Sequence, residues 1–202
     1  MRYTAIKTGL LGLLLSLVVG LSGCTEKQPL SIGFIGGLSG RVADLGTAGR
    51  NGATLAIEQQ NLKGPVQGRM LKLIAVDDQQ NVQSGIAAIE SLLEKNVTAI
   101  IGPMTSSMAV EMVPLANRAE TVIVSPTANT EQLANTDDYF FRVISSTSYY
   151  ARHLADFLYN DRQLRRVSII YDLNNAAFTE SFQSSFRDSF AQLGGKVTRT
   201  RT

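Results

Sequence analysis

"TAIIGPMTSSMA", residues 98–109, joins a short apolar run to a Gly-Pro pair and three hydroxyl residues. The apolar run, residues 99–102, predicts a buried strand, and the apolar spacing from Met108 onward predicts a helix. A strand followed closely by a helix is the repeating unit of parallel α/β sheets. The hydroxyl residues between them, Thr105, Ser106 and Ser107, suit a helix cap, a grip for a small ligand, a phosphate cradle or a nucleophile.

The same alternation continues on both sides of this stretch. Strands are predicted at residues 30–36, 71–77, 99–102, 121–125, 139–144 and 166–171, and another begins at 196–199. Three helical stripes lie between the first of them: Gly49, Gly52, Ala53, Ala56 and Ile57; Val82, Ile86, Ile89 and Leu93; Met108, Met112, Leu115 and Ala119. Short strand–helix connections predict an α/β fold whose parallel sheet is covered by helices on both faces.

The polar stretch 145–148 predicts a crossing into a second lobe, so the first lobe is placed at residues 30–145 and the second at 146–202. A helix with Tyr150, Leu154 and Phe157 on one face opens the second lobe, and Gly194-Gly195 ends the next helix. One or two strands cannot bury both faces of a sheet. We therefore expect lobe one to be nearly complete and lobe two to be truncated.

The N-terminus has the pattern of a lipoprotein signal peptide. Residues 1–23 combine Arg2 and Lys7 with an apolar run that is shorter than the roughly 20 residues of a membrane span. Leu-Ser-Gly-Cys at residues 21–24 resembles the bacterial lipobox, which implies cleavage before Cys24 and a lipid on its sulfur. Residues 24–29 then form a lipidated linker, and the expected location is the periplasm or cell envelope, anchored to a membrane. The alternatives are a short membrane anchor and an unpaired structural cysteine.

Charge and residue usage exclude several classes of function. Loss of residues 1–23 removes two of the 19 basic residues, which leaves 17 against 17 acidic ones, and no basic run suggests nucleic-acid binding. His153 is the only histidine and Cys24 the only cysteine, so no metal site or cofactor is predicted, and a serine hydrolase would lack an obvious base. Residues 36–40 match neither a dinucleotide nor a nucleophile-elbow motif. Asp77-Asp78 is interpreted as a turn cap, with ligand contact as the alternative.

Two uncharged hydroxyl clusters stand at the predicted carboxyl ends of neighbouring strands. Residues 105–107 follow the third strand, and residues 125–130 follow the fourth. Ligands of open α/β sheets bind beyond these strand ends. A neutral, donor-rich crevice at a helix start suits the carboxylate of a small ligand, while helix capping remains a second role for Ser106 and Ser107.

Six segments in order resemble the type I periplasmic binding proteins, most closely their Leu/Ile/Val-binding branch. They are IGFIGGLSGRVADLGTAGRNGATLAIEQQN, LKLIAVDDQQN, TAIIGPMTSSMA, VIVSPTANTEQL, YFFRVISST and VSIIYDLNNAAFTESF. The resemblance implies a two-lobe fold of which this chain is the N-terminal part. It also implies the ligand-binding residues: Ser106 for the carboxylate with Ser107 beside it, Thr127, Ala128 and Asn129 in the next loop, and Phe178 as an aromatic of the second lobe.

The resemblance further implies a non-enzymatic receptor that hands an amino-acid-like solute to an ABC permease in the inner membrane. A ligand sensor of the same fold, which signals to a receptor or regulator, is the alternative. Asn129 stands where the family has threonine, and Leu45 replaces an aromatic residue. These departures leave the side chain of the ligand open.

Overall fold

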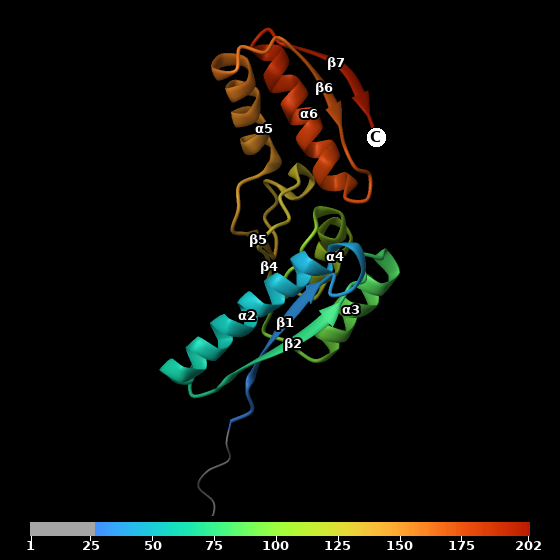
Figure 1. Cartoon of the computed structure of the whole chain (residues 1–202). Helices are drawn as coiled ribbons and strands as arrows, with labels where there is room; N and C mark the ends of the chain where they lie inside the picture. Colours follow the sequence, from blue (N-terminus) through green and yellow to red (C-terminus); the bar gives the residue numbers. More distant parts are fainter. Residues whose placement is uncertain (1–26) are drawn as a thin grey trace, which may run out of the picture.

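A computed structural model describes residues 27–202, in which strands and helices alternate along the chain (Figure 1). The first elements are β1 (Leu30–Gly36), the 3-10 turn η1 (Gly40–Val42), α2 (Ala43–Lys63), β2 (Leu71–Asp77), α3 (Val82–Glu94), β3 (Ala99–Ile101), α4 (Ser106–Arg118), β4 (Ile123–Ser125), the 3-10 turn η2 (Glu131–Leu133) and β5 (Phe140–Arg142). They are followed by α5 (Thr147–Asp156), the π-helical turn η3 (Phe157–Asp161), β6 (Arg166–Ile170), α6 (Ala176–Gln192) and β7 (Lys196–Arg201).

Within the described residues, five strands form one parallel sheet in the order β2-β1-β3-β4-β5. The direction in which the sheet grows reverses at β1, because β2 pairs with one edge of β1 and β3 with the other edge. In parallel sheets of this kind, ligands bind beyond the carboxyl ends of the strands near such a reversal.

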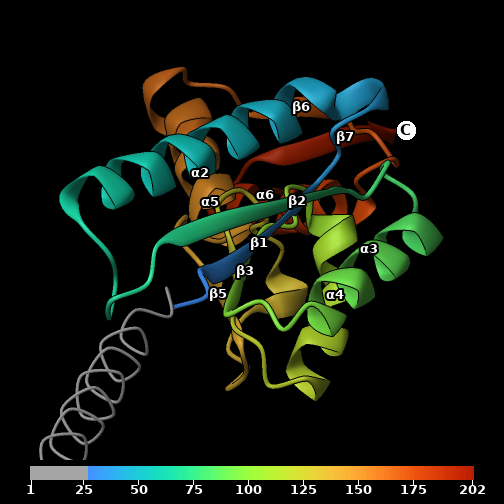
Figure 2. The same cartoon turned by 90° about the horizontal axis from the view of Figure 1, so that it is seen from below.

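Helices cover both faces of this sheet, with α2 on one face and α3 and α4 on the other (Figure 2). Successive residues of a strand point to opposite faces, so the two faces have different core residues. Ile35 packs with residues of α3 and α4 such as Leu92 and Met112, whereas Phe34 packs with Ala53 of α2 and Met104. The near-continuous apolar runs of β1 and β3 are therefore explained by burial on both sides.

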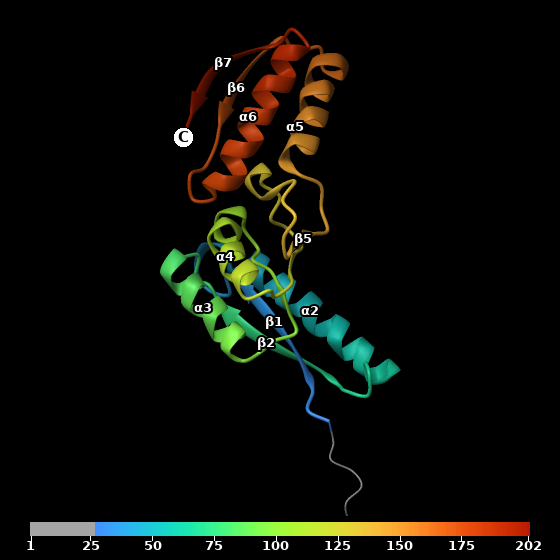
Figure 3. The same cartoon turned by 180° about the vertical axis from the view of Figure 1, so that it is seen from behind.

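The remaining strands, β6 and β7, form a separate parallel pair within the described residues. Helices α5 and α6 pack closely against each other beside this pair (Figure 3). Their core contains Ala151, Ala155, Phe186 and Phe190, with Val167 of β6 packed against it. The chain passes from the first sheet to this second group between Arg142 and Thr147.

The sequence-based strands agree well with the structure. The predicted strands 30–36 and 71–77 have the observed limits, and β3, β4 and β5 are one, two and three residues shorter than predicted. The α/β class with helix-covered parallel sheets is confirmed. Residues 1–23, Cys24 and the first part of the 24–29 linker lie outside the described residues.

Two predicted helix faces are partly wrong. In α2, Gly52 and Ala56 are exposed, whereas Gly49 and Ala53 of the same predicted stripe face the sheet near Phe34. Gly46, which the stripe did not include, lies against Gly37 in the loop after β1. A Cβ atom at Gly46 would lie 1.9 Å from the carbonyl oxygen of Gly37, so only a glycine at position 46 lets the two backbone segments lie this close. Periodicity alone could not show which small residues face the sheet.

In α5, the apolar stripe Tyr150, Leu154 and Phe157 is 42%, 39% and 45% exposed. The buried residues of α5 are Thr147, Ala151 and Ala155, and the two alanines pack with Phe186 and Phe190 of α6. Apolar periodicity predicted the helix correctly, but its apolar stripe is not the face that is fully buried.

Candidate functional site

The loops that follow β3 and β4 meet at Ser106 and Asn129. Ile101 pairs with Val124, so the carboxyl ends of the two strands are adjacent. The Oγ atom of Ser106 accepts a hydrogen bond from the backbone N–H of Asn129 at 3.2 Å. Ser106 is 1% and Asn129 7% exposed. The structure thus brings the two predicted hydroxyl-rich loops into direct contact.

Hydrogen bonds within lobe one fix the positions of these loops. Ser125 Oγ donates to the carbonyl of Pro103 at 2.6 Å and accepts from the backbone N–H of Ala128 at 2.9 Å. The Thr127 hydroxyl donates to the carbonyl of Met104 at 2.5 Å. The Thr127 hydroxyl therefore already donates its proton within lobe one. Its backbone carbonyl and the lone pairs of its hydroxyl oxygen remain as acceptors for other partners. Ala128 is buried behind the loop.

The site offers neutral hydrogen-bond donors and no charge. Neither residues 102–109 nor residues 123–130 include a charged side chain. The Ser106 oxygen accepts the hydrogen bond from Asn129, so its O–H group remains available as a donor to a ligand. Within residues 27–202, the side-chain amide of Asn129 has no hydrogen-bond partner and is a second available donor. Together with the free N–H groups at the start of α4, these donors can hold a carboxylate.

Nucleophilic chemistry finds no support in this geometry. His153 is exposed on α5, where its ring is tilted by 39° against that of Tyr149 with centroids 4.2 Å apart. Among the described residues, no group of His, Cys, Asp and Glu side chains is arranged to hold a metal ion. Because His153, the only histidine of the chain, lies exposed on α5, Ser106 has no histidine base beside it.

Ser107 contacts the second lobe. Its backbone N–H donates to Asn175 Oδ1 at 3.0 Å, and its Oγ accepts from the backbone N–H of Ala177 at 3.2 Å. Asn175 and Ala177 lie at the start of α6. Ser107, the neighbour of Ser106 in the chain, thus connects the two lobes through these hydrogen bonds.

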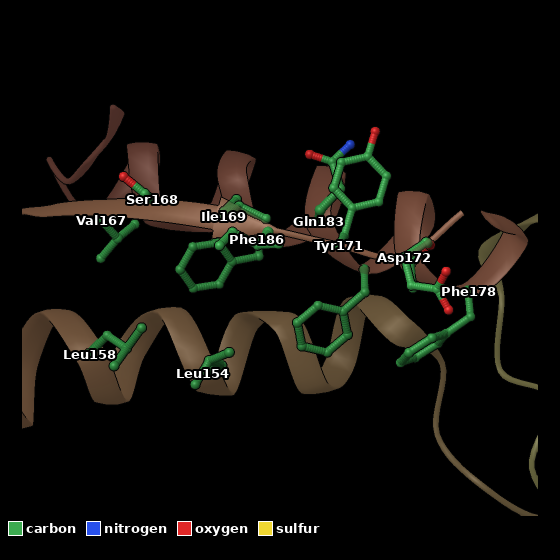
Figure 4. A pocket seen from close by; sticks show the side chains of 13 residues that line it. Leu154, Leu158, Val167, Ser168, Ile169, Tyr171, Asp172, Phe178, Gln183 and Phe186 are labelled. Carbon is green, nitrogen blue, oxygen red and sulfur yellow. The ribbon is translucent and has the colours of Figure 1, made fainter. Parts of the chain in front are cut away.

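Phe178 lies in the first turn of α6 and lines an apolar cavity of about 550 Å³ between α5, α6 and β6 (Figure 4). Its ring centroid is 5.9 Å from that of Phe182. None of the lobe-one candidates, Ser106, Thr127 or Asn129, lines this cavity. The structure therefore places Phe178 at the apolar cavity of the second lobe rather than at the hydroxyl loops.

The Asp77-Asp78 pair supports the loop geometry beside the site. Asp77 accepts a hydrogen bond from the backbone N–H of Gln79 at 2.8 Å, as expected of a turn cap. It also accepts from Leu38 N–H and Ser39 Oγ, in the loop after β1, at 2.8 and 2.6 Å. Burial tends to raise the pKa of Asp77, but these hydrogen bonds outweigh it and hold the pKa below its usual range.

Asp78 is completely buried, and burial raises the pKa of its carboxyl despite two hydrogen bonds from Gln80 to Oδ1. Gln80 in turn accepts from the hydroxyl of Thr105, the residue before α4, at 3.1 Å. Asp78 therefore acts indirectly, by orienting the side chain that contacts Thr105.

Glu131 is the acidic side chain closest in sequence to Asn129. It accepts from the backbone N–H of Ser148 at 2.8 Å, at the start of α5. Burial raises the pKa of Glu131, but hydrogen bonds from Ser146 and Ser148 and the charge of Arg142 outweigh it and lower the pKa. Its charge stabilises the N-terminus of α5, where a helix favours an anion.

The family described as "Periplasmic binding protein" matches residues 29–202 of this chain. The chain belongs to the periplasmic binding protein family. The expected type I fold, represented by its N-terminal part, is confirmed by this match and by the similar structures below.

Among similar proteins, the "Leu/Ile/Val-binding protein homolog 3" of Brucella melitensis is 25% identical over 166 residues, which are 82% of this chain and 45% of the relative. A branched-chain amino acid transporter substrate-binding protein of Streptococcus pneumoniae, solved with isoleucine, has a TM-score of 0.79 and 25% identity and covers 86% of this chain and 49% of its own. A leucine-binding protein of Thermotoga maritima has the same TM-score at 22% identity, with 86% and 49% covered.

This periplasmic binding protein thus spans about half the length of the relatives it matches. The relatives named here are binding proteins by description. Across residues 27–202, no helix has both the length and the apolar character needed to cross a membrane.

Sequence reasoning missed Asn175 and Gln80. Asn175 precedes a helix, a position that usually indicates a cap within the same helix, and nothing in the sequence pairs it with Ser107 across 68 residues. Gln80 adopts a positive φ of 52° in the turn after β2, which no sequence pattern indicated.

Proposed function

We propose that this chain is the ligand-binding N-terminal part of an extracytoplasmic solute-binding lipoprotein of an ABC importer. The ligand is an amino acid or a similar small carboxylate, and the protein transfers it to an ABC permease without catalysis. The contact between Ser106 and Asn129 at the start of α4 is the observation on which the proposal depends. The names of the similar proteins support an amino acid as the ligand class.

In this proposal the carboxylate accepts from the Ser106 hydroxyl, the Asn129 amide and N–H groups at the start of α4. Hydrogen bonds to a charged group are the stronger ones. Thr127 and Ala128 contribute through their backbone, and Ser107 lies within the same helix start. Phe178 would contact the ligand from the second lobe only if α6 changes its position relative to the cavity it now lines.

Leucine and leucinamide, which lacks the carboxylate, test this assignment. We expect leucine at millimolar concentration to shift the NMR amide signals of Ser106 and Asn129 in the 202-residue chain, and leucinamide to leave them unchanged. Ser106→Ala should weaken leucine binding about fivefold or more, because one hydrogen bond to a charged group is lost. Ser91→Ala, a serine of α3 outside the site, is the matched control. Equal shifts with leucinamide would show that the carboxylate is not recognised here.

We further propose that Cys24 carries the lipid anchor. Each buried CH₂ group adds about 0.8 kcal/mol of membrane affinity, so the two or three acyl chains of a lipoprotein hold it stably. Expressed with its signal, the chain should incorporate labelled palmitate and fractionate with membranes, whereas Cys24→Ser should do neither. Ser22→Ala, a conservative change in the same segment, is the control. Equal palmitate incorporation by wild type and Cys24→Ser would contradict the anchor.

A further inference from the structure

Helices α4 and α6 begin in different lobes, and neither is capped by its own N-cap side chain. Thr105 precedes α4 and Asn175 precedes α6, and neither makes a side-chain hydrogen bond to its own helix. The first N–H groups of a helix need partners from outside the helix. Each of these two helices therefore depends on another part of the molecule, and the two starts lie close together in Figures 1 and 3.

The two helices exchange caps. Asn175 Oδ1 accepts from Ser107 N–H, the second N–H of α4, at 3.0 Å. Ser107 Oγ accepts from Ala177 N–H, the second N–H of α6, at 3.2 Å. The second N–H is one of the two that an ordinary N-cap side chain satisfies. Each lobe thus supplies the cap for a helix of the other lobe.

We infer that Ser107 and Asn175 form a reciprocal clasp that holds the two lobes together, and that Asn175 competes with a ligand carboxylate for the start of α4. The competition rests on the proposed function, whereas the clasp itself does not. Ser107 N–H adjoins Ser106, so the Asn175 amide oxygen and a carboxylate bound at Ser106 draw on the same group of N–H donors. Asn175 is thereby a positioning residue that sets how readily the site opens.

A second contact between the lobes has a different character. Arg41 and Asp172 form an ion pair at 3.0 Å, with side chains 65% and 46% exposed. A hydrogen bond from the Asn174 backbone, with Arg41 beside it, lowers the pKa of Asp172 to about 2. Exposed ion pairs contribute little and are weakened by salt. The clasp consists of uncharged groups, so its effect should persist at high salt.

Other interlobe hydrogen bonds lie where the chain crosses between the lobes. Thr147 N–H donates to the carbonyl of Asn129 at 2.9 Å, and Glu131 N–H donates to Ser181 Oγ at 3.1 Å. These bonds are close to the covalent connection and can be kept when the lobes separate. The clasp is therefore the contact whose loss opens the site.

Residue-resolved amide hydrogen exchange on the 202-residue chain tests the clasp without any ligand. Asn175→Ala should accelerate exchange about fivefold or more at Ser107, which loses its acceptor, and also at Ala177, whose acceptor is intact. Ser107→Ala should accelerate exchange at Ala177 and also at residue 107 itself, although Asn175 remains. Both effects should persist in 0.5 M NaCl.

Asn81→Ala is the matched control. Asn81 is also an N-cap asparagine, but it accepts from Ser84 N–H within its own helix α3. It should accelerate exchange at Ser84 and leave Ser107 and Ala177 unchanged. Unchanged protection of Ile100 and Phe190 in every variant shows that both lobes are still folded. If each clasp variant accelerates only the amide whose acceptor was removed, the caps are independent and the clasp is refuted.

Titration with leucine then tests the competition. Asn175→Ala should bind leucine about threefold or more tightly than wild type, and Asn81→Ala should bind it as wild type does. Equal affinity of wild type and Asn175→Ala for leucine would refute the competition. The clasp would then still be tested by the hydrogen-exchange measurements alone. If neither binds leucine or any other amino acid, the proposed function fails, and the cross-effects at Ser107 and Ala177 still decide the clasp.

Discussion

Gly102→Ala is expected to destabilise the chain by about 3 kcal/mol or more, and thus to abolish folding if the wild type is marginally stable. Gly102 has a φ of +116°, and a Cβ atom at this position would lie 2.0 Å from the backbone oxygen of Ile35. Because the clash is with the backbone of β1, no side-chain rotation relieves it. Residue 102 also donates its N–H to Val124 at 2.9 Å, so a shift would disturb the loop that leads to Ser106.

Gly52→Ala is the matched control, because a Cβ atom at Gly52 meets no atom within 4 Å. Gly52 lies in the exposed middle of α2, where alanine should stabilise the helix by about 0.5–1 kcal/mol. Denaturant unfolding followed by circular dichroism should therefore move in opposite directions for the two glycines. A Gly102→Ala variant within 0.5 kcal/mol of wild type would mean that the strand ends are packed differently from this structure.

The second large effect concerns affinity: the 202-residue chain should bind no amino acid more tightly than about 1 mM, or roughly −4 kcal/mol. Tight binding of a small ligand requires that most of its surface be buried. Ser106, Thr127 and Asn129 belong to one lobe, and none of them lines the cavity between α5, α6 and β6. A few hydrogen bonds of about 1.5–3 kcal/mol each are opposed by several kcal/mol of association entropy.

Calorimetry and NMR titration of the monomeric chain measure this affinity. The Brucella melitensis protein, of which this chain covers 45%, provides the comparison in the same titrations. Micromolar binding by the 202-residue chain would show that the first lobe recognises the ligand without a second wall. Ser106→Ala should then abolish that binding.

The fold class and the order of the elements follow from the sequence. Residues 30–36 and 71–77 are mostly apolar stretches between segments that contain polar, proline and glycine residues, so the limits of these strands could be predicted to the residue. The two hydroxyl loops could also be placed side by side, since both follow strands of one parallel sheet. This placement and the family resemblance predict Ser106 and Asn129 as site residues. In the structure, the Ser106 Oγ and the Asn129 backbone nitrogen are 3.2 Å apart.

Which face of each helix is buried, and which side chains pair across the lobes, depends on how the elements pack. In α5, Ala151 and Ala155 pack with Phe186 and Phe190 of α6, whereas the larger Tyr150 and Leu154 remain 42% and 39% exposed. Asn175 reaches Ser107 only because α6 is oriented with its start toward α4. Periodicity describes one helix at a time, whereas both outcomes depend on the positions of two, and the packing of whole lobes sets these positions.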